Sequence, residues 1–151
     1  MPYSRLFYHF VWATKERLPL ITESNQERLY AIIAVKVKEL RGVLYAVNGM
    51  ADHVHLVVAL PPSGSLAKFV GQVKGSSSHL GSRLEVGSTL FAWQAEHGVV
   101  SISETHLPTV VRYVQQQQRH HVTEDNRCNV RKLWIRKTRN RLSCLVTKLL
   151  N

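Results

Sequence analysis

The stretch at residues 52–60 restricts the fold of this chain more than any other. After Asp52 it consists of apolar residues interrupted only by His53 and His55. Because side chains on a strand alternate between its two faces, both imidazoles would lie on one face, with aliphatic side chains on the other. We therefore predict a strand that buries its aliphatic face and offers a two-imidazole metal site on the opposite face.

The spacing of these histidines is weak support by itself. A chain with 8 histidines among 151 residues contains roughly 0.4 His-x-His pairs by chance. A functional interpretation of the pair therefore needs independent support from the rest of the chain.

The length and composition indicate one globular domain. With 151 residues, of which 44% are hydrophobic, the chain can bury a sizeable core. It contains no run of 18 or more apolar residues and starts without the long apolar stretch of a signal peptide. Cys128 and Cys144 form no CxxC pair, which fits a reducing compartment and argues against a structural zinc site. We expect a cytoplasmic protein without a membrane partner.

The net charge of +10 is concentrated at the end of the chain. Residues 1–126 contain 12 Lys and Arg and all 10 Asp and Glu, whereas residues 127–151 contain 8 Lys and Arg and no acid. A basic tail of this kind contacts phosphates or another anionic surface, or is a solvated end without a specific role. Composition leaves both alternatives open.

Hydrophobic periodicity predicts an α+β fold. Strands are expected at residues 6–13, 43–47, 53–60, 90–94 and 99–103. Asn48-Gly49 supplies the hairpin turn between the second and third strands. With the helices, the order is β-α-β-β-α-β-(β)-α. We expect an antiparallel sheet with helices packed on one face and the other face open, in a ferredoxin- or RRM-like βαββαβ core followed by a C-terminal helix.

Three amphipathic helices follow from the spacing of apolar residues. The first should begin at a capping box at residues 24–27 and end at Gly42, and the second spans residues 66–84. The third is expected to be capped by Ser103 or Thr105, with Pro108 in its first turn.

Polar side chains lie along one edge of the third helix. Tyr113 and Gln117 are four residues apart and so share a side of the helix, and His120 continues roughly along the same edge. A hydroxyl, an amide oxygen and an imidazole would then project together. Alternatively, the tyrosine is a half-buried anchor and the glutamine belongs to a polar surface.

Three further polar residues have structural explanations beside functional ones. We expect His9, in the first strand, to be packed or hydrogen-bonded rather than a metal ligand. Lys68 and Lys74 lie on the polar side of the second helix, where they could meet phosphates or belong to a solvated face.

Several short segments recur in the order of a known family. They are YHFVWATK at 8–15, NGMADHVH at 48–55, KGSSS at 74–78, FAWQ at 91–94, SIS at 101–103, RYVQQQ at 112–117 and RHH at 119–121. Together they resemble the His-hydrophobic-His (HUH) single-tyrosine transposases of small bacterial insertion sequences, including their REP-associated relatives. The resemblance covers about residues 3–121.

The resemblance implies a role for each matched position. His53 and His55 match the metal-binding histidines, Gln117 the third metal ligand and Tyr113 the nucleophile, with His120 as an accessory candidate. Two imidazoles and one neutral amide oxygen suit Mg²⁺ or Mn²⁺ completed by water and substrate. Single-stranded DNA is the expected substrate, because an open sheet face with basic and aromatic groups can take an unstacked strand. The resemblance adds hairpin-bearing element ends. It also implies a homodimer, with the tyrosine acting in cis or in trans. The candidates for contacts with the DNA backbone are Lys68, Lys74, Arg127, Arg131, Lys132, Arg136 and Lys137.

The resemblance divides the chain into two parts. Residues 1–121 are expected to form the transposase domain, and residues 122–151 a basic tail that departs from the family by divergence or a shifted reading frame. Within the domain, EHGVV at 96–100 replaces the family's Gly-Tyr-Gly-aromatic pattern, which affects the local loop more than the chemistry.

Three functions are compatible with these features. The leading one is a transposase that cleaves and rejoins single-stranded DNA through a covalent 5′-phosphotyrosine with the help of a divalent metal. The alternative is a catalytically inactive nucleic-acid-binding relic of the same fold. A metal-dependent phosphodiesterase that uses water is disfavoured, because no second histidine pair or carboxylate cluster accompanies the first.

Overall fold

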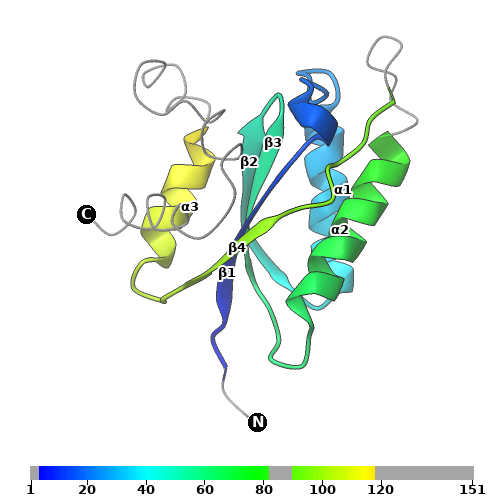
Figure 1. Ribbon diagram of the computed structural model, residues 1–151. Helices are drawn as coiled ribbons and strands as arrows, with labels where there is room; N and C mark the ends of the chain where they lie inside the picture. Colours follow the sequence, from blue (N-terminus) through cyan, green and yellow to red (C-terminus); the bar gives the residue numbers. More distant parts are fainter. Residues whose placement is uncertain (1–3, 82–89, 118–151) are drawn as a thin grey trace.

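The computed structural model of the chain describes residues 4–81 and 90–117. Its elements are β1 (Phe7–Ala13), a short 3₁₀ helix η1 (Lys15–Arg17), α1 (Gln26–Glu39), β2 (Val43–Met50), β3 (His53–Ala59), α2 (Leu66–Gly81), β4 (Gly98–Ile102) and α3 (Leu107–Gln115) (Figure 1). The predicted order is confirmed, except that residues 90–94 form no strand. An isolated bridge joins Trp93 to Thr14 there instead.

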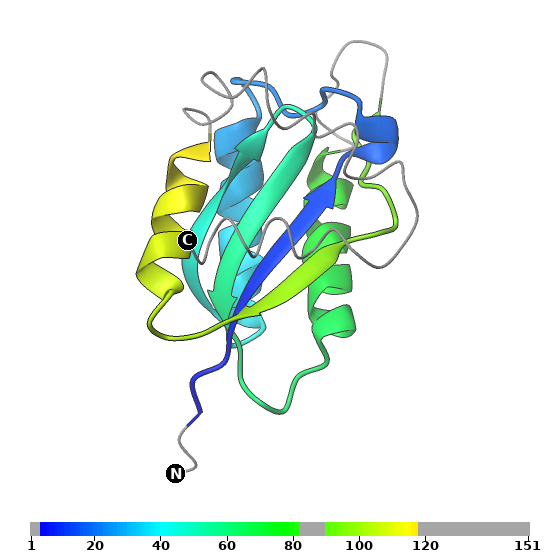
Figure 2. The same ribbon diagram turned by 60° about the vertical axis from the view of Figure 1, so that its left-hand side comes forward.

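The four antiparallel strands lie in the order β2-β3-β1-β4 (Figure 2). β3 is central and pairs along its whole length with β1 on one side and β2 on the other. β4 pairs with the other edge of β1. The strand that carries the two histidines is therefore held by backbone hydrogen bonds on both sides, and the predicted α+β class is confirmed.

Different helices cover the two faces of this sheet. α1 and α2 pack side by side on one face, and α3 lies on the other, against β2 and β3 (Figure 1). The strand residues beneath α1 and α2 are Phe10, Trp12, Val54, Leu56 and Val58. Those beneath α3 are Phe7, Ala46 and Val57, which meet Leu107, Val110 and Val114. The second face is thus only partly open, because the apolar stripe of α3 needs a surface on which to be buried.

The hairpin turn lies two residues beyond its predicted position. β2 continues to Met50, Asn48 pairs with His55 and Gly49 with Val54, so the turn falls at Ala51 and Asp52. The turn prediction was wrong because Asn48 uses its side chain for a distant contact, described below, and because Gly49 is required inside the strand. A Cβ at Gly49 would lie 2.1 Å from the carbonyl oxygen of His53.

The predicted N-terminal caps were also wrong. α1 begins after Asn25, whose side chain accepts a hydrogen bond from the Thr22 N–H at 2.9 Å and donates to the Leu20 carbonyl at 2.9 Å. No capping box forms, because this buried asparagine organises the preceding turn instead. α3 begins after His106, whose Nδ1 lies 2.6 Å from the Ser103 hydroxyl, and Pro108 stands in its first turn as predicted.

The C-terminal ends of α1 and α2 can be compared with the predicted ends. α1 stops at Glu39, near the predicted stop, and the Gly42 N–H donates to the Val37 carbonyl at 2.9 Å. The left-handed residue at this helix end is Arg41 rather than the glycine. The last part of the predicted second helix, residues 82–84, lies outside the described residues.

We expect Gly49→Ala to lower the free energy of unfolding by about 1–3 kcal/mol, because the added methyl group collides with the β3 backbone. Gly71→Ala is the matched control. A Cβ at Gly71 in α2 meets nothing within 4 Å, so this change should stabilise the protein by about 0.5–1 kcal/mol through helix propensity. Urea unfolding of both variants provides the test, and equal stabilities would contradict the close approach at Gly49.

Candidate active site

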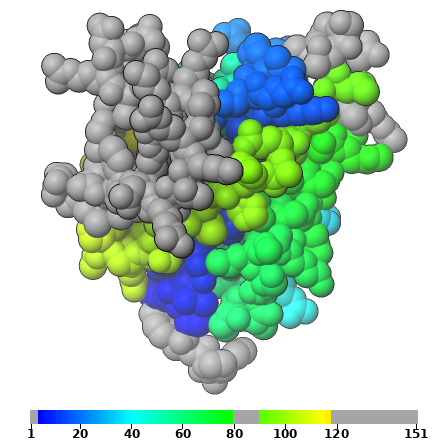
Figure 3. Space-filling view, viewed as in Figure 1, coloured from blue at the N-terminus to red at the C-terminus, as the bar shows by residue number. Residues whose placement is uncertain are grey.

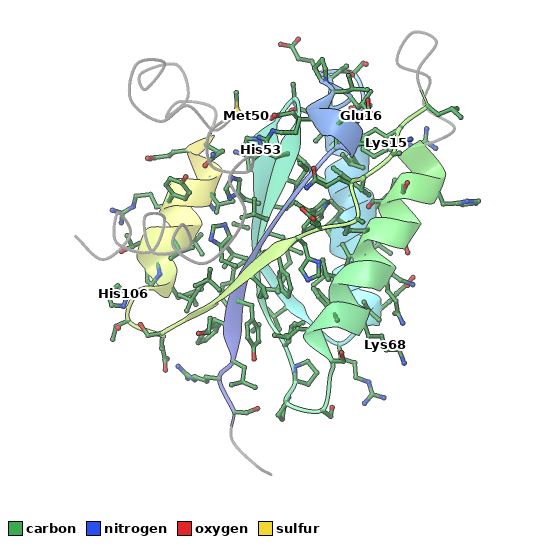
Figure 4. The ribbon with its side chains drawn as sticks, in the orientation of Figure 1. Lys15, Glu16, Met50, His53, Lys68 and His106 are labelled. Carbon is green, nitrogen blue, oxygen red and sulfur yellow. The ribbon has the colours of Figure 1, made fainter. Side chains whose placement is uncertain are left out.

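The two histidines of β3 lie on the sheet face that α3 covers. His53 and His55 are 6% and 4% exposed, and their ring centroids are 5.1 Å apart. His53 stands at the tip of the hairpin, close to Met50 (Figure 4). The predicted alternation is confirmed, since Val54, Leu56 and Val58 belong to the core on the opposite face.

α3 carries the predicted tyrosine to this histidine pair. The aromatic ring of Tyr113 meets that of His55 edge-on, with centroids 6.0 Å apart. Gln117, predicted on the same helix, lies two residues beyond the last residue of α3 and is buried, with 2% exposed. The structure therefore brings the tyrosine and both histidines together within one chain.

Asn48 attaches the end of α3 to the sheet. Its side-chain amide donates to the carbonyls of Val114 and Gln115, each at 3.1 Å, and its Oδ1 accepts the N–H of Gly49 at 2.9 Å. Carbonyls in the last turn of a helix have no partner within the helix, so an outside donor stabilises them. This contact fixes the helix end that lies between Tyr113 and Gln117.

Asp52 and Arg17 form a chain of polar contacts that ends at His53. The Asp52 Oδ1 lies 2.7 Å from His53 Nδ1, and Arg17 lies 2.9 Å from the other carboxylate oxygen. Burial alone would raise the pKa of the Asp52 carboxyl, but the hydrogen bond from His53 and the charge of Arg17 outweigh it, so the pKa is below its ordinary value. Asp52 is therefore an ionised acceptor at neutral pH.

The backbone of η1 is unusual where it supplies this arginine. Glu16 and Arg17 both have left-handed backbones, with φ of 55° and 56°. Non-glycine residues rarely adopt this region, and such strain persists only where surrounding contacts hold it. Two contacts hold Arg17: its backbone N–H donates to the Thr14 carbonyl at 3.0 Å, and its side chain pairs with Asp52.

His9 of β1 is the partner of His55. Its Nε2 lies 2.9 Å from His55 Nδ1, and the two rings stack with centroids 5.1 Å apart. Burial lowers the pKa of His9 to about 4, so this imidazole is neutral at pH 7. The prediction that His9 is packed or hydrogen-bonded is confirmed.

The residues present fit a weakly held, hard divalent cation. The Nδ1 atoms of His53 and His55 both face protein partners, which makes the Nε2 atoms the nitrogens suited to a metal. Within the described ranges, no group of three or more His, Cys, Asp or Glu could hold a metal. A metal here would need a neutral oxygen such as the Gln117 amide, completed by water or substrate, as Mg²⁺ and Mn²⁺ accept.

The basic candidates fall into separate regions. Lys68 is exposed on α2, on the sheet face opposite the histidines (Figure 4). The Lys74 ammonium donates to the carbonyls of Gln94, Ala95 and Glu96, at 2.6, 2.9 and 3.2 Å. The segment that Lys74 holds lies between η1 and α2 on the surface (Figure 3). The contact of Lys74 with DNA stays a prediction beside this structural role. The other candidates lie outside the described residues: His120, Arg127, Arg131, Lys132, Arg136 and Lys137.

Sequence reasoning missed the residues that support the pair. Asp52 adjoins His53 in the sequence, which is a signal that could have been noticed. His9 was expected to be packed or hydrogen-bonded, but its partner was not identified. Nothing in the sequence pointed to Arg17 or to the role of Asn48. All four act through contacts that depend on the hairpin, on strand pairing or on the docking of α3.

With this geometry established, comparison with known proteins identifies the family. A family model described as "Transposase IS200 like" matches residues 2–117. The chain belongs to the IS200-like transposase family. The resemblance inferred from the sequence is thereby confirmed.

Two relatives illustrate how far this IS200-like transposase has diverged. It is 25% identical over 121 residues to the ISDra2 transposase TnpA of Deinococcus radiodurans, covering 75% of this chain and 84% of the relative. It is 32% identical over 72 residues to the transposase for insertion sequence element IS200 of Salmonella typhimurium, 47% of each chain. This chain thus spans most of the first relative and about half of the second.

Solved structures share the fold. A crystal structure of a transposase from Deinococcus radiodurans R1 has a TM-score of 0.58 and 26% identity, covering 77% of this chain and 93% of that one. A REP-associated tyrosine transposase bound to a REP hairpin has a TM-score of 0.59 and 17% identity, covering 80% and 72%. In the part of the IS200-like transposase that the structure describes, no helix has the length and apolarity to cross a membrane.

Asn48→Asp should destabilise the protein by about 1–3 kcal/mol, because two hydrogen bonds to α3 are lost while the acceptor for the Gly49 N–H remains. Hydrogen exchange provides the specific measurement. We expect faster exchange in α3 than in β1 relative to the wild type, and uniform acceleration through both elements would contradict a local attachment.

Lys74→Met should lower the free energy of unfolding by about 1–3 kcal/mol, because the ammonium no longer holds the three carbonyls. Lys68→Met is the matched control. The Lys68 side chain is exposed, so its loss should change stability by less than about 0.5 kcal/mol. Thermal unfolding of the two variants tests this assignment, which equal melting temperatures would refute.

Proposed function

We propose that this chain cleaves and rejoins single-stranded DNA through a covalent 5′-phosphotyrosine, with Tyr113 as the nucleophile. His53, His55 and the amide oxygen of Gln117 would hold Mg²⁺ or Mn²⁺. The observation that carries the proposal is the edge-on contact of Tyr113 with His55, at 6.0 Å between ring centroids. A tyrosine beside a buried histidine pair, in an IS200-like transposase, supports an active site whose residues come from both β3 and α3.

The covalent step exchanges one phosphoester for another. The Tyr113 oxygen attacks the phosphorus, a bond forms between them, and the bond from phosphorus to the 3′ oxygen of the upstream nucleotide breaks. The phenolic proton is transferred, through water, to the departing 3′ oxygen, which becomes a hydroxyl. Because the phosphotyrosine keeps the energy of the original bond, a later 3′ hydroxyl can reverse the step and join a different strand without a nucleoside triphosphate.

The bound metal would supply positive charge to the non-bridging phosphate oxygens. The protein's own residues would position the metal and the tyrosine. β3 presents the imidazoles, and α3 orients the tyrosine through its apolar contacts and the Asn48 attachment. A buried, preorganised pair loses little free energy to reorganisation when substrate arrives.

The proposed substrate is single-stranded DNA with a hairpin at the element end. The REP-associated tyrosine transposase that shares the fold was bound to a REP hairpin, which supports a hairpin ligand here. Part of the sheet face beside α3 could accept an unstacked strand. We expect a homodimer. The contact of Tyr113 with a histidine of its own chain favours action in cis.

The test is formation of a covalent adduct. Single-stranded oligonucleotides with candidate insertion ends, incubated with the protein and Mn²⁺, should give a protein–DNA species that survives denaturing electrophoresis. Tyr113→Phe should abolish it, because the phenolic oxygen is the attacking atom, and chelation of the metal should abolish it reversibly. An adduct that persists in Tyr113→Phe would refute the nucleophile assignment.

Tyr45→Phe is the matched control, because Tyr45 packs its ring on Phe7 and is 39% exposed. The adduct should form normally in this variant. DNA binding without any adduct under several metals would favour the inactive relic. Cleaved product without a protein-linked intermediate would favour the water-dependent phosphodiesterase.

A further inference from the structure

The two histidines of β3 each have a partner on the same side of the ring. His53 Nδ1 lies 2.7 Å from the Asp52 carboxylate, and His55 Nδ1 lies 2.9 Å from His9 Nε2. These partners reach the site by different routes, Asp52 from the hairpin turn and His9 from the neighbouring strand. The same ring nitrogen is engaged in both cases.

We propose that Asp52 and His9 are positioning residues that select the tautomers of His53 and His55, so that each presents an Nε2 lone pair to a divalent metal ion. This inference rests on the proposed function, because it concerns the same metal site. It adds two residues that act through His53 and His55 and determine which nitrogen of each is presented to the metal.

The chemistry of the hydrogen bond between Asp52 and His53 determines which atom is the donor. An ionised carboxylate only accepts hydrogen bonds, so His53 Nδ1 must be the donor. A neutral His53 then carries its proton on Nδ1 and has its lone pair on Nε2. Arg17 holds the other oxygen of the carboxylate at 2.9 Å and so keeps Asp52 oriented toward the ring.

Either ring can donate the hydrogen bond between His9 and His55, and only one of the two directions leaves His55 able to bind a metal. If His9 donates, His55 carries its proton on Nε2 and cannot bind a cation there. If His55 donates from Nδ1, its Nε2 lone pair is available, and His9 is the acceptor. We assign the second direction, which gives His55 the same tautomer as its neighbour His53.

Strand register explains why His9 is suited to this role. β1 places His9 opposite Val57, two residues from His55, so the two histidines are diagonal neighbours on one face. The rings stack at an interplanar angle of 26°, and His9 is 5% exposed. Buried and held between the strands, His9 has one geometry in which to meet His55.

The first measurement uses the unmodified protein without metal. Long-range ¹H–¹⁵N correlation of the imidazole nitrogens distinguishes the two neutral tautomers. We expect protonated Nδ1 and unprotonated Nε2 in both His53 and His55. A His55 protonated on Nε2 would overturn the proposal directly, whatever the variants do.

The second measurement is Mn²⁺ binding, read from paramagnetic broadening of the His53 and His55 ring signals. His9→Phe keeps a ring but removes the acceptor, and it should weaken binding about 10- to 100-fold. His9→Gln, whose amide oxygen can accept from Nδ1, should restore most of the affinity. In the same way, Asp52→Ala should weaken binding more than Asp52→Asn.

Tyr8→Phe is the matched control, because Tyr8 stands next to His9 on β1 and packs against the core on the opposite face. Its Mn²⁺ affinity should equal that of the wild type. Selective broadening that is unchanged in His9→Phe would overturn the inference and leave the metal site intact. Absence of broadening at His53 and His55 in the wild type would overturn both the metal site and the inference.

Discussion

The burial of two imidazoles in the central strand is the constraint on which the candidate site depends. A buried polar group without a hydrogen bond costs about 1–3 kcal/mol, so each ring needs a partner within the protein. Asp52 meets this need for His53 and His9 meets it for His55. The contacts that make burial tolerable are also those that orient the rings, so stability and site geometry share the same residues.

One face of β3 serves two purposes along its length. Toward the hairpin tip it carries the imidazoles, and toward the other end it carries Val57, which packs with the apolar stripe of α3. Because the helix is anchored on the aliphatic half, its next turns pass the imidazole half, where Tyr113 meets His55. Packing of apolar side chains therefore determines how α3 docks on the sheet, and Asn48 attaches the far end of the helix.

The predictions from sequence succeeded where local periodicity reflects burial. The alternation on β3, the apolar stripe of α3 and the order of elements all follow from which side chains avoid water. They failed where a polar side chain serves a distant partner. Asn48 was assigned to a turn, yet it bonds to carbonyls 66 and 67 residues away.

The sequence by itself determined that His53 and His55 share a face opposite a core, and that Tyr113 lies at the edge of the apolar stripe of a helix. Those relations depend only on the repeat of a strand and of a helix. The tertiary structure decided that Tyr113 meets His55, and that His9 and Arg17 reach the site across 46 and 35 residues. Strand order, register and helix docking create these contacts. This tertiary arrangement minimises the free energy of the whole chain rather than that of any one segment.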